Sequence, residues 1–104
     1  MKTKRITWSP FAKKDVRSIK AFFDRRNQST AYSKKLIRLF KESEILIQKY
    51  PHATIETNEK DVRGHLVLHY ILLFSIEEEE IQILRVWDTR RDPSQLNLFL
   101  NPKP

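Results

Sequence analysis

Residues 70–93, with the sequence YILLFSIEEEEIQILRVWDTRRDP, hold the two clearest strand signals in this chain of 104 residues. Tyr70–Ile76 is almost entirely apolar, which is typical of a central strand that is buried on both faces. Residues 77–80 predict a solvated acidic turn, and residues 81–87 predict a second strand. Because Pro93 cannot donate a ladder hydrogen bond, this second strand has to end before it.

Arg90 and Arg91 follow the last strand where it leaves the sheet, a place that suits phosphate binding. If the strand is regular, its side chains alternate between the two faces of the sheet. The two predicted faces are Gln82, Leu84 and Val86 on one side, and Ile81, Ile83, Arg85 and Trp87 on the other.

The N-terminal part of the chain predicts a short strand followed by a helix. Residues 4–8 have the alternation of a strand, with Ile6 and Trp8 on one side. Ser9 can cap free amide groups at the start of a helix, and Pro10 suits the first helical position. The helix is expected to end near residues 25–28. Its apolar stripe consists of Ala12, Val16, Ile19 and Phe23.

A second helix follows closely. Ser29 or Thr30 can cap its start, and Pro51 ends it. Because the connection between the two helices is short, they are expected to form an antiparallel hairpin. The residues that repeat at helical spacing, and so predict its buried stripe, are Tyr32, Leu36, Leu39, Ser43, Leu46 and Tyr50.

Beyond Pro51 the pattern changes from helix to strand. Residues 54–57 suit an extended segment, and residues 61–68 predict a strand. The predicted order is β-α-α-β-β-β in one domain over residues 1–104. We therefore expect an α+β fold, with an N-terminal helical hairpin packed on one face of a small, mainly antiparallel sheet. The other face is either a binding groove or is closed by residues 94–100.

Charge is divided unevenly along the chain. Residues 1–41 hold 13 of the 20 Lys and Arg residues against two acidic residues, which gives a formal charge of +11. The remainder holds seven cations and 11 acidic residues, which gives −4. The basic part should attract an anionic partner, although a solvated basic surface explains the charge equally well. With no cysteine and no apolar run of membrane-spanning length, a cytoplasmic protein without disulfides is expected.

Four pieces of the sequence occur in an order and spacing that are together specific. They are WSPFA at residues 8–12 with Asp15-Val16, Pro51 after the second helix, Tyr70–Ile76, and ILRVWDTRRDP at residues 83–93. With these residues the chain resembles, over about its whole length, the RelE/ParE superfamily of bacterial toxins, which includes plasmid stabilisation and addiction-module proteins. The resemblance implies a growth-inhibiting toxin of a type II toxin–antitoxin system and a cognate antitoxin that neutralises it.

The superfamily divides by target. RelE-like members resemble ribosome-dependent mRNA endoribonucleases, and ParE-like members inhibit DNA gyrase without nuclease activity. The RelE-like pattern has a lysine pair on the second sheet strand, an arginine early in the next strand, and a tyrosine or histidine near the C-terminus. Here no lysine lies between Asp61 and Ile76, Ile71 takes the arginine position, and no tyrosine or histidine follows Trp87. These departures place the chain nearer the ParE-like side.

RNA cleavage would need a base, an acid and cations that stabilise the phosphate. The candidates are Arg63 and Arg85 for charge, with His65 or His69 for proton transfer. In a regular strand Arg63, His65 and His69 share one face, and a bend at Leu68 would break this. A strand histidine is more often structural than catalytic. No metal motif or cofactor signature is present, so we expect neither a metal ion nor a cofactor.

For nucleic-acid or target binding the candidates are Arg85, Trp87, Arg90 and Arg91. The alternative explanation for Arg90 and Arg91 is pairing with Asp88 and Asp92 or with antitoxin carboxylates, and for Trp87 it is packing.

The sequence thus predicts a ParE-like toxin that acts on DNA gyrase or another nucleic-acid machine. The alternatives are a RelE-like endoribonuclease that acts on ribosomes and mRNA, and a non-toxic basic nucleic-acid-binding module of the same fold. The antitoxin's toxin-binding segment should be acidic, with apolar residues that pack along the helical hairpin or the exposed sheet face. The oligomeric state stays open between a homodimer and a toxin–antitoxin hetero-oligomer.

Overall fold

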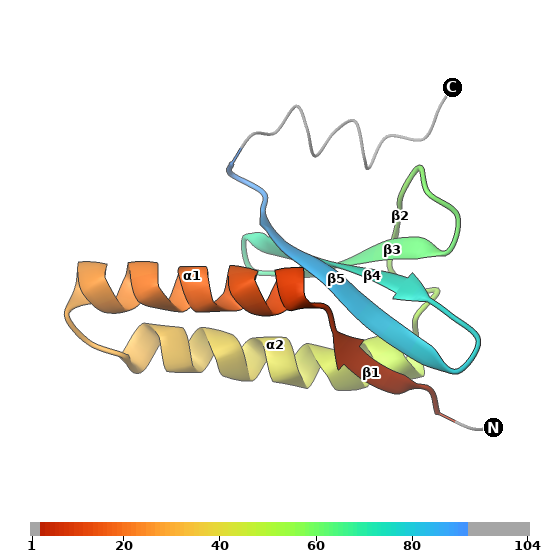
Figure 1. The fold of residues 1–104 in the computed structure, drawn as a ribbon, viewed down its shortest axis with the longest axis horizontal. Helices are drawn as coiled ribbons and strands as arrows, with labels where there is room; N and C mark the ends of the chain where they lie inside the picture. Colours follow the sequence, from red (N-terminus) through yellow and green to blue (C-terminus); the bar gives the residue numbers. More distant parts are fainter. Residues whose placement is uncertain (1–2, 92–104) are drawn as a thin grey trace.

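Two helices and a five-stranded sheet form the fold in the computed structural model, which describes residues 3–91 (Figure 1). The predicted α+β class is confirmed, and the two-residue strand β2 joins the predicted elements. Residues 94–100, which were one of the two alternatives for the second sheet face, lie outside the described residues. The elements in chain order are β1 (Arg5–Trp8), α1 (Pro10–Asn27), α2 (Ala31–Lys49), β2 (Ile55–Glu56), β3 (Val62–Val67), β4 (Tyr70–Ile76) and β5 (Glu80–Asp88).

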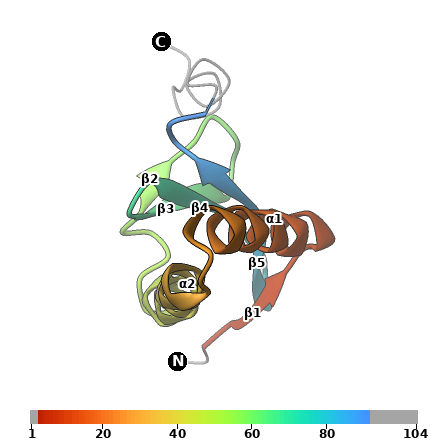
Figure 2. The ribbon, with the colours of Figure 1, turned by 90° about the vertical axis from the view of Figure 1, so that its left-hand side faces the viewer.

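The sheet has the strand order β1-β5-β4-β3-β2. The first strand lies parallel to the last, and every other neighbouring pair is antiparallel, as predicted for a mainly antiparallel sheet. The parallel pair is possible because the helical hairpin carries the chain between β1 and the rest of the sheet. Helix α1 packs along β5, and α2 contacts β3 and β1. Figure 2 shows the two helices of the hairpin nearly end-on.

The predicted start of α1 is confirmed. The Ser9 hydroxyl accepts a hydrogen bond from the amide of Ala12 at 3.0 Å, and Pro10 takes the first helical position. The helix ends at a left-handed residue, Gln28, with φ of 49°. At the start of α2 the cap residue Thr30 makes no side-chain hydrogen bond to the helix, whereas the hydroxyl of Ser29 accepts from the amide of Ala31 at 3.1 Å.

The predicted buried stripe of α2 is wrong in its second half. Leu46 and Tyr50 are 51% and 61% exposed. The predicted and observed stripes both repeat at helical spacing, but they are offset by about one residue around the helix axis. Only contact with α1 and the sheet selects between them. The buried residues of α2 are Ser33, Leu36, Phe40, Ser43 and Ile47.

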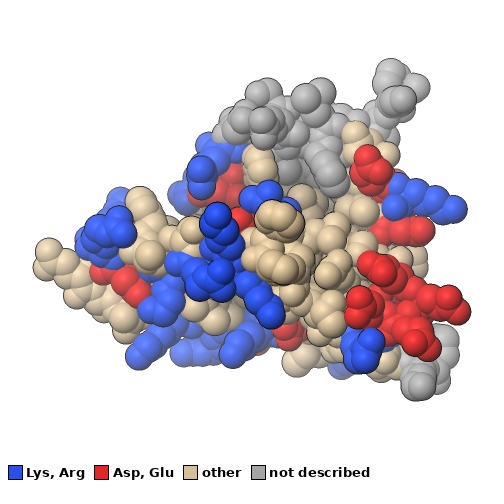
Figure 3. All heavy atoms as spheres, viewed as in Figure 1, with Lys and Arg blue, Asp and Glu red and all other residues tan. Residues whose placement is uncertain are grey.

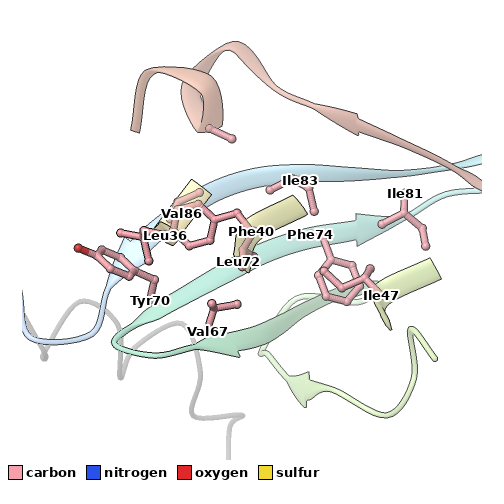
Figure 4. Close-up of a cluster of buried hydrophobic side chains, with 11 residues drawn as sticks. Leu36, Phe40, Ile47, Val67, Tyr70, Leu72, Phe74, Ile81, Ile83 and Val86 are labelled. Atoms are coloured by element: carbon pink, nitrogen blue, oxygen red, sulfur yellow. The ribbon is translucent and has the colours of Figure 1, made fainter. Parts of the chain in front are cut away.

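Strand β4 is buried on both faces, as its apolar sequence predicts. Tyr70, Leu72 and Phe74 point into the main core beneath the helices, where Phe40 packs edge-to-face on Tyr70 (Figure 4). On the opposite face Ile71 and Leu73 form a smaller cluster with Trp87.

A β-bulge changes the faces of β5. Leu73 lies opposite Arg85, but the next residue of β4, Phe74, lies opposite Ile83, so Leu84 is the extra residue. Because of this insertion, Val86 joins Ile81 and Ile83 in the main core. The predicted grouping, which put Val86 with Gln82 and Leu84, is therefore wrong.

The turn between β3 and β4 consists of Leu68 and His69. Leu68 has φ of 55°, which ends the alternation of β3 and separates His69 from the face of Arg63 and His65. The turn is held against the end of β5, because the amide and the hydroxyl of Thr89 both donate to the carbonyl of His69 at 2.8 Å.

Within residues 3–91, no helix has the length and apolar character needed to cross a membrane.

Candidate functional site

The helical hairpin extends past the end of the sheet, as Figure 1 shows. A groove of about 780 Å³ is lined by residues of α1, the start of α2, the turn before β4, and the end of β5. We call it the strand-end groove, since the start of β4 and the end of β5 form one of its sides and α1 forms much of the other. Its charged lining residues are Asp15, Arg26, Arg85, Asp88, Arg90 and Arg91, and its aromatic ones are Phe22, Phe23, Tyr32, His69 and Tyr70.

Arg85 enters the groove by reaching over the free edge of β5. Strand β1 ends opposite Ile83, so beyond it this edge of β5 has no strand partner within residues 3–91. The carboxylate of Asp15 takes that role: it accepts from the amide of Val86 at 2.9 Å and from Arg85 Nε and Nη2 at 2.8 and 3.1 Å. The bond to Asp15 raises the pKa of Arg85. This arginine is therefore held in an internal ion pair.

Arg90 folds back on Asp88. The Asp88 Oδ1 atom accepts from the amide of Arg90 at 2.9 Å and from its Nε at 3.3 Å. Burial acts to raise the pKa of Asp88, but the hydrogen bonds from Arg90 and the nearby charge of Arg91 outweigh it, so the pKa is lowered. Burial, followed by the charge of Asp88, raises the pKa of Tyr70. The alternative explanation for Arg90, pairing with Asp88, is therefore observed, whereas Asp92 lies outside the described residues.

Arg63 lies away from this groove and supports a loop. Its Nε donates to the Thr54 hydroxyl at 2.8 Å, and its Nη2 donates to the carbonyls of His52 and Thr54 at 2.9 and 2.6 Å. These bonds hold the segment that leads into β2.

His65 lies on the helix-facing side of β3, opposite Leu72 on β4. Its half-buried position lowers the pKa of its imidazole. Among the described residues, the lining of the strand-end groove includes Arg85 but neither His65 nor Arg63. The structure thus does not gather Arg63, His65 and Arg85 around one cavity, whereas His69, the other histidine candidate, lines the strand-end groove with Arg85.

Comparison with known proteins agrees with this fold. Residues 6–93 match the family described as ParE toxin of type II toxin-antitoxin system, parDE. The chain belongs to the ParE toxin family. A solved structure titled "Chromosomal ParDE TA system from P. aeruginosa" superposes with a TM-score of 0.67 at 18% identity, over 81% of this chain and 94% of that one. A search of curated proteins finds no significant match.

Within this ParE-family fold, Trp87 is separated from the arginines of the groove. It packs on Ile71 and Leu73 on the sheet face that points away from the helices. Its indole N–H is buried, with no hydrogen-bond acceptor among the described residues. Of the four candidate binding residues, the groove therefore collects Arg85, Arg90 and Arg91 but not Trp87.

The sequence interpretation missed the groove residues that come from the helices. Phe22 and Arg26 lie on α1, and Tyr32 lies at the start of α2, so only the hairpin brings them to the end of β5. The exposed pair Arg25-Arg26 at the end of α1 was the sequence signal that could have pointed to these residues.

Within residues 3–91, no group of three or more His, Cys, Asp and Glu residues could hold a metal ion.

Proposed function

We propose that this ParE-family toxin inhibits growth by acting on DNA gyrase, and that a cognate antitoxin neutralises it. The observation that carries the proposal is the family match over residues 6–93. Arg63 and His65 do not line the groove that holds Arg85, although His69 does. An RNA-cleaving centre needs a base, an acid and cations around one phosphate. In this proposal the toxin acts in the cytoplasm, and Arg90 and Arg91 contact the target.

The proposed antitoxin contact is the outer side of the helical hairpin. Figure 3 shows Lys and Arg side chains gathered over α1 and α2, while acidic side chains gather at the turn between β4 and β5. A second groove, of about 390 Å³, has an apolar floor between the helices. Its apolar lining residues are Trp8, Val16, Ile37 and Phe40, and its charged ones are three cations, Lys13, Arg17 and Lys41, and one carboxylate, Glu44, which accepts from the Trp8 indole at 2.7 Å.

An apolar floor with an excess of cations, three against one carboxylate, favours an acidic, amphipathic segment, as the charge division of the sequence predicts. Binding of such a segment should weaken as salt rises, because these cations are exposed to solvent. Binding that stays constant from low to high salt would contradict the electrostatic part of this proposal.

A supercoiling assay with purified gyrase tests the target. We expect wild-type protein to block supercoiling and to leave mRNA intact on translating ribosomes. The double variant Arg90→Ala, Arg91→Ala should need about tenfold more protein for half inhibition, which corresponds to about 1.4 kcal/mol of lost contact.

The matched control is Lys49→Ala with Lys60→Ala, which removes the same charge from exposed positions outside the strand-end groove. It should inhibit like wild type. Codon-positioned mRNA cuts that disappear in Arg85→Ala or His65→Ala would instead establish the ribosome-dependent nuclease and reject the gyrase proposal.

A further inference from the structure

We propose that the strand-end groove binds single-stranded nucleic acid, with phosphate groups on its arginines and a base against Phe22. This inference goes beyond the proposed function, because it requires neither gyrase nor an antitoxin. It rests on the charge, the exposed aromatic surface and the size of the groove.

The groove carries an excess of positive charge. Four arginines face two carboxylates, Asp15 and Asp88. Within the described residues, the side chains of Arg26 and Arg91 are exposed and form no ion pair. Among residues 3–91 these two guanidinium groups have no carboxylate partner, and their planar forks suit phosphate oxygens.

The two paired arginines also keep donors for a ligand. The side chains of Arg85 and Arg90 are 46% and 56% exposed despite their carboxylate partners. A guanidinium has five N–H donors. Within the described residues, the hydrogen bonds of Arg85 to Asp15 use Nε and Nη2, so its Nη1 remains open to an anion. Asp15 and Asp88 thus orient the arginines without occupying all their donors.

An aromatic surface lines the same groove. Phe22 is 51% exposed, although most large apolar side chains of α1 face the core. The ring centroids of Phe22 and Phe23 are 5.0 Å apart in an edge-to-face contact, and those of Phe23 and Tyr32 are 4.7 Å apart. The exposed ring of Phe22 is therefore held in place by other aromatic rings. A supported aromatic face beside cations is the arrangement on which bases of single strands stack.

Size and shape favour a single strand over a duplex or a peptide. A volume of about 780 Å³ lies within the range of small-ligand sites and is large enough for a nucleotide unit. In a duplex the base faces are stacked on each other and cannot reach Phe22. An acidic peptide would match the charge but would leave the aromatic face without a flat partner.

Fluorescence anisotropy with purified full-length protein tests the inference. The probes are labelled oligo(dT) and oligo(rU) of about eight nucleotides, a length within the usual site size of single-strand binders. A DNA duplex of equal length and an oligoglutamate of equal charge are the comparison ligands. We expect binding of both single strands, weaker binding of the other two ligands, and a logarithmic salt dependence with a slope of about −1.4 to −2.8 for two to four phosphates.

Two pairs of variants locate the binding. Arg26→Ala with Arg91→Ala should weaken oligo(dT) binding about tenfold, whereas Lys49→Ala with Lys60→Ala should change it by less than about twofold. Phe22→Ala should weaken binding, Phe22→Trp should retain it, and Phe11→Ala is the control. Phe11 is also on α1 and is 67% exposed, but the described lining of the groove does not include it.

Several outcomes would overturn the proposal. Equal losses in the two arginine and lysine pairs would mean general attraction rather than a site. If the duplex bound as tightly as the single strands, stacking of a base on Phe22 would be ruled out. If oligoglutamate bound more tightly, the ligand of the groove would be an acidic protein instead. A preference between DNA and RNA would identify which single strand it holds. Because gyrase is absent from this assay, its result is independent of the supercoiling test.

Discussion

Asp15 and Arg85 are 70 residues apart in the sequence, yet two hydrogen bonds of 2.8 and 3.1 Å join their side chains. The same carboxylate accepts from the amide of Val86, just past the end of the β1–β5 pairing. Asp15 and Arg85 both belong to the sequence pieces that carry the family resemblance. In the structure these two residues contact each other directly. This contact closes the open edge of β5 and fixes one wall of the strand-end groove.

Asp15→Ala should destabilise the fold more than Arg85→Ala. The first change leaves both the Val86 amide and a guanidinium without their acceptor, whereas the second removes only a half-exposed cation. We expect a loss of about 1–3 kcal/mol in the free energy of unfolding for Asp15→Ala and under about 1 kcal/mol for Arg85→Ala. Urea unfolding of both single variants and of the double variant measures the coupling. Strictly additive losses would show that the ion pair contributes nothing.

Ser9→Ala should destabilise the protein by about 1–2 kcal/mol. Its hydroxyl accepts from the amide of Ala12 at the start of α1 and donates to the carbonyl of Leu84 at 2.8 Å, so it joins the helix to β5. Thr30→Ala is the matched control, because Thr30 caps α2 without a side-chain hydrogen bond to it. Similar melting temperatures for the two variants would contradict this account.

Gly64→Ala should cost about 1–3 kcal/mol through overpacking. A Cβ atom at Gly64 would lie 2.9 Å from Cγ2 of Ile71, and 3.6 Å from Cδ2 of Leu73. Combining it with Ile71→Ala removes the obstructing methyl group, so the double variant should lose less stability than the sum of the two single losses. Chemical unfolding measures the three losses. If the loss of the double variant equalled the sum of the two single losses, the contact with Ile71 would not be the cause of the destabilisation by Gly64→Ala.

Stability should fall as the pH is lowered through the range in which His65 titrates. Burial lowers the pKa of His65 below 6.5, so the unfolded chain takes up a proton before the folded protein does. The contribution of neutral His65 is present above pH 6.5 and is lost as the pH falls toward the lower pKa of the folded state.

Melting temperatures of wild type and His65→Gln between about pH 7.5 and pH 5 test this expectation. The variant should show a smaller decrease than wild type over that interval. Asp24 and Asp88 have lowered pKa values, so their contributions are retained until the pH falls through 3.8, and they do not interfere. Parallel curves for the two proteins would rule out His65 as the cause.

Local signals in the sequence identified most elements of the fold. Ser9 and Pro10 mark the start of α1, and the apolar run Tyr70–Ile76 is the fully buried central strand. These predictions succeed because capping, proline geometry and burial depend on residues close together in the chain. The prediction for α2 was less accurate, since Leu46 and Tyr50 repeat at helical spacing but face solvent.

Tertiary structure alone decided the faces of β5 and the composition of the candidate site. The bulge at Leu84 depends on pairing with β4, and it moves Val86 into the core. The strand-end groove combines Arg26 of α1 with Arg90 and Arg91, which are more than 60 positions further along the chain. By itself, then, the sequence determined the elements, the charge division and the family resemblance, all of which are local or cumulative properties. Which side chains share a cavity depends on packing between distant segments, and only the folded chain determines that.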